Sequence, residues 1–292
     1  MKNTLRIVFW TRRGLQTLAL RTFAFFGLVS AIVQFYGAVY VPDKSLKHPL
    51  AVVLATIGTG FLYGLLRTWP RSKVSRTLEA SAHDVTVNVV VGDILKHKGQ
   101  VVVGFSDTFD TDTDGNKVIN ARSLQGQLLA QRFNNDPKEL DRALASSLRG
   151  IAHETTEKRV DKHVGKLSRY PIGTVAVLGT TTDERIYALA YSRMGNNLVA
   201  KSSVHDIWCA LGQLWSAVYI HGQQQPIAIP LVGTGLARVN YLDRESMLRM
   251  TLISFVARSR ENLICNELTV YIHPTDQDKI NMLELKAFLK TL

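Results

Sequence analysis

Two long stretches without a charged residue lie near the N-terminus, at residues 22–41 and 49–66. An α-helix rises about 1.5 Å per residue, so each stretch is long enough, or nearly so, to cross a hydrocarbon layer about 30 Å thick. A soluble helical hairpin normally has a charged face, whereas the polar residues here are small or neutral. No cleavage signal separates the stretches, which argues against a removable leader. We therefore predict two transmembrane helices.

The charges around these stretches predict their orientation. Basic residues cluster before the first stretch and after the second, whereas the connecting loop holds two lysines and one aspartate. Positively charged flanks stay in the cytosol, so we expect a two-span protein of the cell inner membrane with both termini cytosolic. Gly58, Gly60 and Gly64 are expected to let the two helices approach closely.

The net charge of +11 is concentrated in the N-terminal part. Residues 1–80 hold eleven Lys or Arg against two acidic residues, whereas residues 81–292 hold 24 basic and 22 acidic residues. The excess therefore lies beside the predicted spans, where it contacts anionic lipid. We expect the lipid bilayer, and not nucleic acid, to be the partner of this charge. Cys209 and Cys265 fit a reducing compartment without disulfides.

Strand-like and helix-like patterns alternate after residue 82, and we treat residues 71–81 as a linker. Apolar runs typical of strands lie at 84–91, 101–105, 174–178, 185–191, 227–231 and 268–272. Helical spacing occurs at 123–133, 137–148, 203–219, 243–261 and 276–290. This alternation predicts an α/β domain at residues 82–292, in which helices cover both faces of a mixed sheet. Trp208 and Trp215 are expected to pack in its core.

A glycine-containing loop after a predicted strand suits a phosphorylated ligand. Its residues are Val232, Gly233, Thr234, Gly235 and Leu236, followed by Arg238. Glycines let the backbone approach a ligand and direct its N–H groups at an anion. The loop lacks the Gly-Lys-Ser/Thr ending of a Walker A motif. We predict a phosphate site here, although a plain turn explains the same pattern.

Two further strand ends carry candidate ligand-binding residues. Asp93 and Ile94 follow the first strand of the domain, and Gly104, Phe105, Ser106 and Asp107 end the second. Ligands of open α/β sheets bind outside the carboxyl ends of the strands. The carboxylate of Asp93 suits an adenine amino group, although capping a turn is an equally ordinary use of Asp.

With these motifs, residues 84–290 resemble the macrodomain family, whose members bind ADP-ribose and related nucleotides. The resemblance rests on the strand ending in Gly92, Asp93 and Ile94, the strand 101–105, and the loop from Ile229 to Leu236. It implies that Asp93 contacts adenine and that Gly233, Thr234 and Gly235 surround the diphosphate. It implies also that residues 104–107 line the opposite side of the pocket.

The whole chain resembles the membrane-bound macrodomain effectors of Thoeris antiphage systems. The two spans and the segment Ser192–Asn197 carry this likeness, and Met194, Gly195 and Asn196 are expected to contact the group on the distal ribose. The resemblance implies an ADP-ribose-containing signal, made from NAD by a TIR-domain enzyme. Binding would make the effector assemble as a homo-oligomer and disrupt the membrane. No cofactor is implied.

The second loop departs from hydrolytic macrodomains, which usually have an Asn-rich turn followed by a glycine run. Residues 104–110 contain no Asn, and no glycine run follows. We therefore expect a binding protein and not an enzyme. The alternatives are an ADP-ribosyl hydrolase, in which Asp107 or Asp110 activates water, and a passive ADP-ribose receptor.

Two charged segments invite a metal-binding interpretation. Asp110, Asp112 and Asp114 resemble the start of an EF-hand, but Ala121 stands where a bidentate Glu is required. His153 and His163, beside and within the charged segment 154–166, are ten residues apart and lack the spacing of a zinc site. We interpret the first as a solvated acidic turn and the second as a solvated face, and predict no metal.

Overall fold

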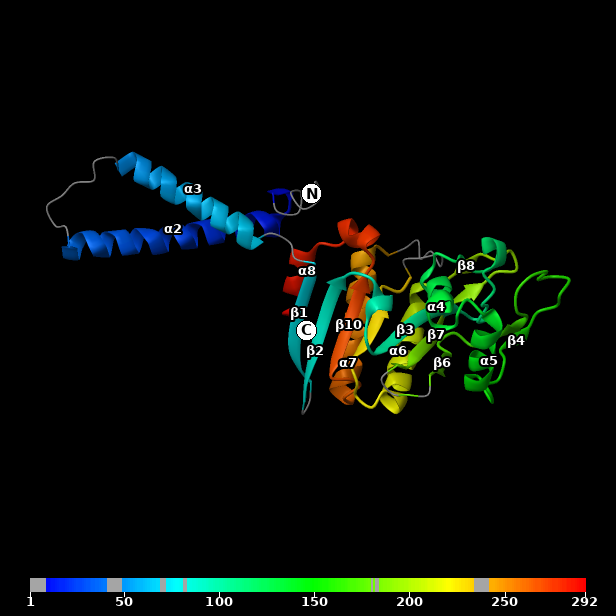
Figure 1. Cartoon of the computed structure of the whole chain (residues 1–292). Coiled ribbons are helices and arrows are strands. Elements are labelled where there is room, and N and C mark those ends of the chain that lie inside the picture. The colour runs from blue at the N-terminus through cyan, green and yellow to red at the C-terminus, as the bar shows by residue number, and fades with distance from the viewer. Residues whose placement is uncertain are drawn as a thin grey trace. The chain divides into compact units, whose positions relative to one another are not determined.

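The computed structural model describes residues 9–40, 49–68, 72–80, 83–179, 181, 184–233 and 242–292. The chain divides into two units, each described below by itself (Figure 1). The first holds residues 1–72 and 281–288, and the second holds residues 73–280 and 289–292.

The first unit contains two long apolar helices, α2 (Arg12–Tyr40) and α3 (Pro49–Thr68). Segments of 23 and 19 residues, Gly14–Tyr36 and Leu50–Thr68, are long and apolar enough to cross a membrane. The helix α2 begins ten residues before the predicted span and includes Arg21. The Arg21 side chain donates to the Arg67 carbonyl and to Thr68 Oγ1, at the C-terminal end of α3, where a positive charge is favourable.

Small residues let α2 and α3 pack closely, as expected. A Cβ atom at Gly60 would lie 3.2 Å from the Thr22 carbonyl oxygen, and one at Gly64 would lie 2.7 Å from Thr22 Oγ1. By contrast, a Cβ at Gly58 would have nothing within 4 Å, so this glycine lies outside the contact. Hydroxyl groups within the helices bond to carbonyls one turn earlier, as Thr59 does to Ala55, which satisfies them without water.

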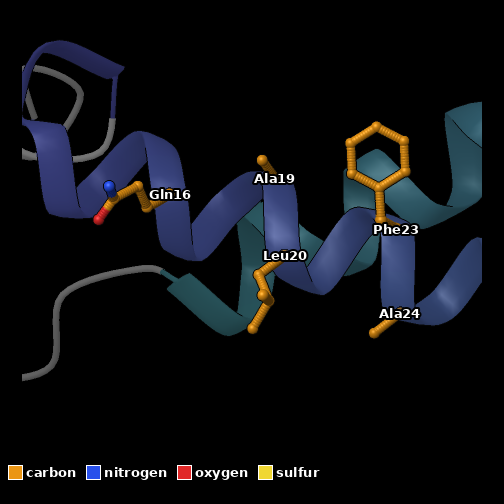
Figure 2. A pocket seen from close by; sticks show the side chains of 5 residues that line it. All are labelled: Gln16, Ala19, Leu20, Phe23 and Ala24. Carbon is orange, nitrogen blue, oxygen red and sulfur yellow. The ribbon is translucent and has the colours of Figure 1, made fainter.

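One face of α2 is hollowed (Figure 2). The lining side chains recur every three or four residues and are Gln16, Ala19, Leu20, Phe23 and Ala24. Four of the five are hydrocarbon or aromatic, so the hollow lacks the donor groups that a phosphorylated ligand needs.

The second unit is built on one mixed sheet. Its strands are β1 (Lys73–Ala80), β2 (His83–Val91), β3 (Gln100–Ser106), β6 (Val175–Leu178), β7 (Ile186–Met194), β8 (Ala200–Lys201), β9 (Ile227–Pro230) and β10 (Glu267–Ile272). Their order is β1-β2-β10-β9-β3-β7-β6, with β8 paired to β7 (Figure 1). The five strands β2, β10, β9, β3 and β7 are mutually parallel, whereas β1 and β6 are antiparallel to their neighbours. The five parallel strands therefore end at one edge.

Residues 73–80 correct the prediction of a linker between the spans and the domain. They form β1, which pairs with β2 from Lys73 opposite Val90 to Ala80 opposite His83. Only Val74 and Leu78 of residues 73–78 are buried. Because β1 is an edge strand, most of its side chains face water, and its sequence lacks the continuous apolar run that marks the central strands.

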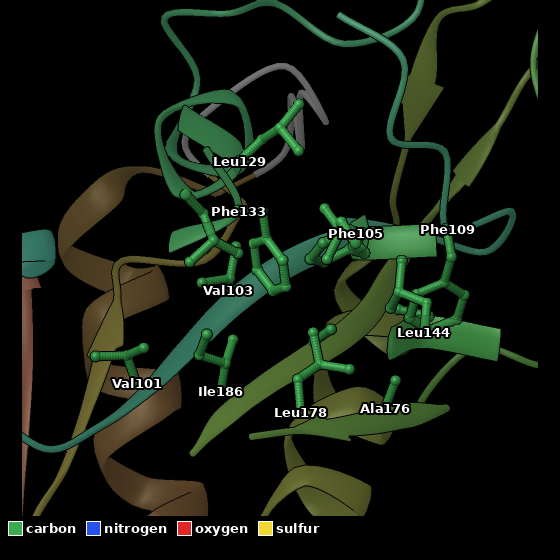
Figure 3. Packing of buried hydrophobic residues seen from close by; sticks show 14 of the residues in the cluster. Val101, Val103, Phe105, Phe109, Leu129, Phe133, Leu144, Ala176, Leu178 and Ile186 are labelled. Atoms are coloured by element: carbon green, nitrogen blue, oxygen red, sulfur yellow. The ribbon is translucent and has the colours of Figure 1, made fainter. Parts of the chain in front are cut away.

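Helices cover both faces of the sheet. They are α4 (Leu124–Arg132), α5 (Pro137–Ser147), α6 (Val204–His221) and α7 (Arg244–Glu261). The last helix, α8 (Met282–Leu289), falls almost entirely in the first unit. Side chains of β3, β6 and β7 pack with those of α4 and α5, as Figure 3 shows for Val103, Leu129 and Leu144. Trp215 of α6 is fully buried against Phe255 of α7, whereas Trp208 is 46% exposed, so the core prediction is wrong for Trp208.

Short polar side chains start the helices where the sequence predicts. Asp136 accepts a hydrogen bond from Lys138 N before Pro137 opens α5, and Asp243 does the same for Ser246 N at α7. Ser203 and Asp206 form a reciprocal capping box at α6. Between these elements lie the short strands β4 (Thr155–Thr156) and β5 (Ser168–Arg169) and the 3-10 turns η1 (Ile94–Lys96), η2 (Asp114–Asn116) and η4 (Pro274–Lys279).

Candidate functional site

The carboxyl edge of the parallel strands gathers the predicted segments. Gly92 and Asp93 follow β2, Ser106 ends β3, and Val232 and Gly233 follow β9. The strand β9 lies between β10 and β3, so the turn at Gly233 is central at this edge, with Asp93 and Ser106 on either side. Backbone bonds continue the sheet here, as from Leu231 N to Tyr271 O. This is the edge where α/β sheets bind ligands.

Asp93 combines a capping role with a place at this edge. Its Oδ1 accepts a hydrogen bond from Leu95 N at 3.0 Å and so caps η1. The side chain of the next residue, Ile94, is buried in the core. Contact of Asp93 with adenine stays a prediction.

Two side chains near the turn at Asp93, those of Tyr271 and His97, are not among the predicted site residues. A Cβ at Gly92 would lie 3.6 Å from the ring of Tyr271, and the Tyr271 hydroxyl lies 3.4 Å from His97 Nδ1. Burial, with the charges of Glu267 and Asp93, raises the pKa of Tyr271, while burial lowers the pKa of His97. Both rings come from positions that show only strand and turn patterns in the sequence.

The glycine-containing loop is described as far as Gly233. Val232 is buried, and Gly233 has φ 78°, a conformation that favours glycine. The backbone N–H of Gly233 donates to the hydroxyl of Tyr191 on β7. The remaining candidates of this loop lie outside the described residues: Thr234, Gly235, Leu236 and Arg238.

Most side chains at the end of β3 already contact other side chains of the protein. Phe105 belongs to the core, and its ring stacks on Phe109 at a centroid distance of 5.7 Å. Ser106 Oγ lies 3.1 Å from Thr108 Oγ1, and both residues are buried. The ring of Tyr191 lies where a side chain at Gly104 would be.

Asp107 is fully buried, and both of its carboxylate oxygens are engaged. Oδ1 accepts from Met194 N and Oδ2 accepts from Arg169 Nη1, each at 2.8 Å. The same arginine donates to Glu157 Oε1 at 2.6 Å and to Asn196 Oδ1 at 3.0 Å. Arg169 thus joins the segments that hold Asp107, Glu157 and Asn196.

The hydrogen bonds that Arg169 makes shift its own pKa and that of Glu157. Burial acts to lower the pKa of Arg169, but the hydrogen bonds to Glu157 and Asp107 outweigh it and raise that pKa. The hydrogen bond from Arg169 and a further one from Asn196 lower the pKa of Glu157. Arg169 and Glu157 are therefore held in their charged forms near neutral pH.

The segment predicted to contact the distal ribose, residues 194–196, is bonded to Asp107 and Arg169. Met194 is 3% exposed and packs with Val118 and Ile119, so its side chain faces the protein interior. Asn196 bonds to Arg169 and Glu157 through its side chain. A Cβ at Gly195 would lie 3.0 Å from the Val199 carbonyl oxygen, so a tight turn occupies this position. Contact of these residues with a ligand stays a prediction.

Two segments interpreted as solvated prove to be joined in the interior. Lys162 is fully buried, and its Nζ lies 3.1 Å from Oδ2 of Asp110, which is 1% exposed. Thr108 and the backbone N–H of Lys166 also donate to Asp110. The interpretation as a solvated turn and a solvated face is therefore wrong at Asp110 and Lys162, because each charge neutralises the other. It holds for Asp112 and Asp114, which are exposed.

Metal binding gains no support from the described part of the chain. Within it, no three His, Cys, Asp or Glu side chains are grouped closely enough to hold a metal ion. Cys209 and Cys265 are both free thiols, and burial raises the pKa of Cys265 to about 12.

Several solved structures are similar to this chain. A point mutant of the Oceanobacillus iheyensis macrodomain has 14% identity and a TM-score of 0.49, covering 75% of this chain and 100% of that one. The macrodomain of the same organism with ADP has 14% identity and a TM-score of 0.42, covering 76% and 100%. A tomato leucine aminopeptidase mutant has 16% identity and a TM-score of 0.42, covering 72% and 37%. A search of curated proteins found no match.

The family assignment rests on a sequence profile. The profile described as Thoeris protein ThsA, Macro domain, matches residues 87–273, which is more than half of the chain. The matched segment runs from β2 to the residue after β10 and contains the strand ends described above. The chain therefore belongs to the Thoeris ThsA macrodomain family.

Proposed function

We propose that this protein is a membrane-anchored receptor and effector that binds an ADP-ribose-type nucleotide through its macrodomain. The observation that carries the proposal is the meeting of Asp93, the end of β3 and the Gly233 turn at one edge of the sheet. A carboxylate for adenine and a glycine turn for phosphates are the two recognition elements that such a nucleotide requires. Two helices with the length and composition of membrane spans supply the anchor.

Binding without hydrolysis is the second part of the proposal. A general base must reach the proton that it removes, directly or through one water molecule. Asp107 is fully buried between Arg169 and Met194 N, and Asp110 is buried against Lys162. Both candidate bases of the hydrolase alternative thus have structural partners, which supports a binding role.

Membership of the Thoeris ThsA macrodomain family supports a signalling role as the third part of the proposal. The nucleotide would be made from NAD by a TIR-domain enzyme, and binding would drive assembly of the protein and disruption of the membrane. Recovery of the full chain from phage-infected cells, followed by mass spectrometry of the retained small molecule, would identify the signal. Recovery of a nucleotide without ADP-ribose would contradict this part.

Calorimetry of the full chain in detergent with ADP-ribose tests the binding site. In the Asp93→Ala variant, loss of a hydrogen bond to a charged group is expected to weaken binding about ten-fold or more. Asp136→Ala is the matched control, because Asp136 also caps a helical turn, by accepting from Lys138 N at 2.9 Å. It should lose similar stability, about 1 kcal/mol, and keep wild-type affinity.

The Gly233→Glu variant tests the loop, because it places a negative charge where phosphate oxygens should lie. It is expected to abolish binding, and Gly233→Ala separates this effect from strain at φ 78°. Wild-type affinity in Gly233→Glu would exclude the loop as the phosphate site. Product analysis completes the test, since rapid turnover that depends on Asp107 would favour the hydrolase.

A further inference from the structure

Tyr191 is the extra residue of a bulge between β7 and β3. Phe105 pairs with Ala190, but the next residue, Ser106, pairs with Ser192, so Tyr191 has no partner on β3. A bulge redirects the side chain of its extra residue, and bulges are frequent beside functional sites. Here the bulge lies within one residue of the carboxyl end of β3.

The redirected ring lies over Gly104. A Cβ at Gly104 would be 3.0 Å from Tyr191 Cδ1 and 3.3 Å from Cζ, and closer still to Cε1. Real Cβ atoms do not approach an aromatic ring so closely, so only glycine at 104 leaves room for it. From the sequence, Gly104 is expected to line the ligand pocket, whereas in the structure the atoms nearest to its Cβ position belong to Tyr191.

The hydroxyl of Tyr191 reaches the glycine-containing loop. It accepts a hydrogen bond from Gly233 N–H, and burial raises the pKa of Tyr191 to about 12, so it keeps its proton at neutral pH. A phenol that accepts one hydrogen bond still has its own proton to donate. Among the described residues the Tyr191 hydroxyl donates to no acceptor, and the side chain is partly exposed, so a ligand can reach this proton.

We propose that Tyr191 is a ligand-binding residue whose hydroxyl, held by Gly233 N–H, donates to a diphosphate oxygen of the bound nucleotide. The inference rests on the proposed function and names a contact for its phosphates. The ring, seated over Gly104, fixes the direction of that donor. Tyr191 then distinguishes nucleoside diphosphates from nucleosides.

Calorimetry of the full chain in detergent with ADP, and competition by adenosine, tests this role. Tyr191→Phe keeps the ring and removes the donor, so ADP should bind about ten-fold or more weakly while adenosine binds as in the wild type. Tyr187→Phe is the matched control, since Tyr187 lies on the same strand and its buried hydroxyl donates to Gln100 Oε1 at 3.1 Å. It should leave ADP affinity unchanged.

A second pair of variants tests the position of the ring. Gly104→Ala displaces the ring and should weaken ADP binding by a similar factor. The same change should add little in a Tyr191→Ala background, because residues in contact have non-additive effects.

The outcomes separate the two proposals. Wild-type ADP affinity in Tyr191→Phe, or equal losses for ADP and adenosine, would overturn the role of Tyr191 and leave the nucleotide site intact. Failure of the wild-type protein to bind either ADP or ADP-ribose would overturn the proposed function and this inference with it.

Discussion

At the scale of single residues, the main surprise is how many charged side chains near the site are structural. Asp107 and Asp110 lie in the loop that follows β3, and each is paired with a basic residue from the segment 154–169. The partners are separated by 62 and 52 positions, so no local pattern pairs them. Sequence reasoning could place these carboxylates at a strand end, but it could not show that their oxygens are already engaged.

The buried pair of Lys162 and Asp110 should be sensitive to loss of one partner. Lys162→Met leaves a carboxylate buried without its counter-charge and should lower the free energy of unfolding by about 3–5 kcal/mol. Asp110→Asn in the same chain should recover part of this loss. Urea unfolding checks both, with the exposed Lys158→Met as control, expected within about 0.5 kcal/mol of wild type. Equal stabilities of Lys162→Met and Lys158→Met would show that Lys162 is solvated.

The pair of Arg169 and Glu157 should make stability depend on pH. The pKa of Glu157 is lowered in the folded protein, so its contribution is complete above the unfolded-state value, about 4.3, and is lost as pH falls through the folded value. The wild type should therefore exceed Glu157→Gln in stability at pH 7, and the difference should shrink below about pH 4. Unfolding midpoints measured from pH 7 to pH 3 check this. A difference that grows in acid would mean that the sign is wrong.

At the scale of elements, the sequence predicts helices and strands correctly where their buried residues recur periodically or form a continuous apolar run. The central strands and the capped helices lie where the sequence predicts them, because apolar runs and N-cap side chains are local features. The strand β1 was missed because it gains its partners from β2, and its exposed positions hold polar and charged residues. The bulge at Tyr191 was missed for a similar reason, since register is a property of two strands.

The contact between α2 and α3 offers a matched pair of glycines. Gly64→Leu forces a side chain against Thr22 Oγ1 and the Leu18 carbonyl, whereas Gly58→Leu enters open space. Overpacking typically costs about 1–3 kcal/mol, so only Gly64→Leu should separate the helices. Disulfide formation between Phe25→Cys and Tyr63→Cys reports the contact, because these rings lie 5.1 Å apart. Cys209 and Cys265 are replaced by serine for this measurement. Equal yields in both glycine variants would contradict the arrangement.

At the scale of the whole molecule, the sequence predicted a mixed-sheet macrodomain after two apolar helices, and the family match confirms the macrodomain. The edge that bears the candidate site also follows from sequence, because the carboxyl ends of parallel strands share one edge. The rings of Tyr191, Tyr271 and His97 could not be predicted there. Their positions depend on a bulge and on contacts between strands that are far apart in sequence.

The distribution of Lys and Arg predicts that both ends of the chain are cytosolic. A cysteine introduced by Lys44→Cys, in a chain without Cys209 and Cys265, should react with an impermeant maleimide applied to the outer side of the membrane. A cysteine at Lys290→Cys should react only after the membrane is opened. The reverse pattern would invert the orientation.

The register of β1 has a mechanical consequence. The last residue of α3 is Thr68, and β1 begins only a few residues later at Lys73. Lys73 is opposite Val90, which is three residues before Asp93, and opposed residues of an antiparallel pair lie about 5 Å apart. The first residue of β1 and the turn that holds Asp93 thus lie at the same end of one antiparallel pair of strands. A displacement of the turn at Asp93 would therefore reach β1, the edge strand of the sheet, across one pair of backbones, without passing through the body of the domain.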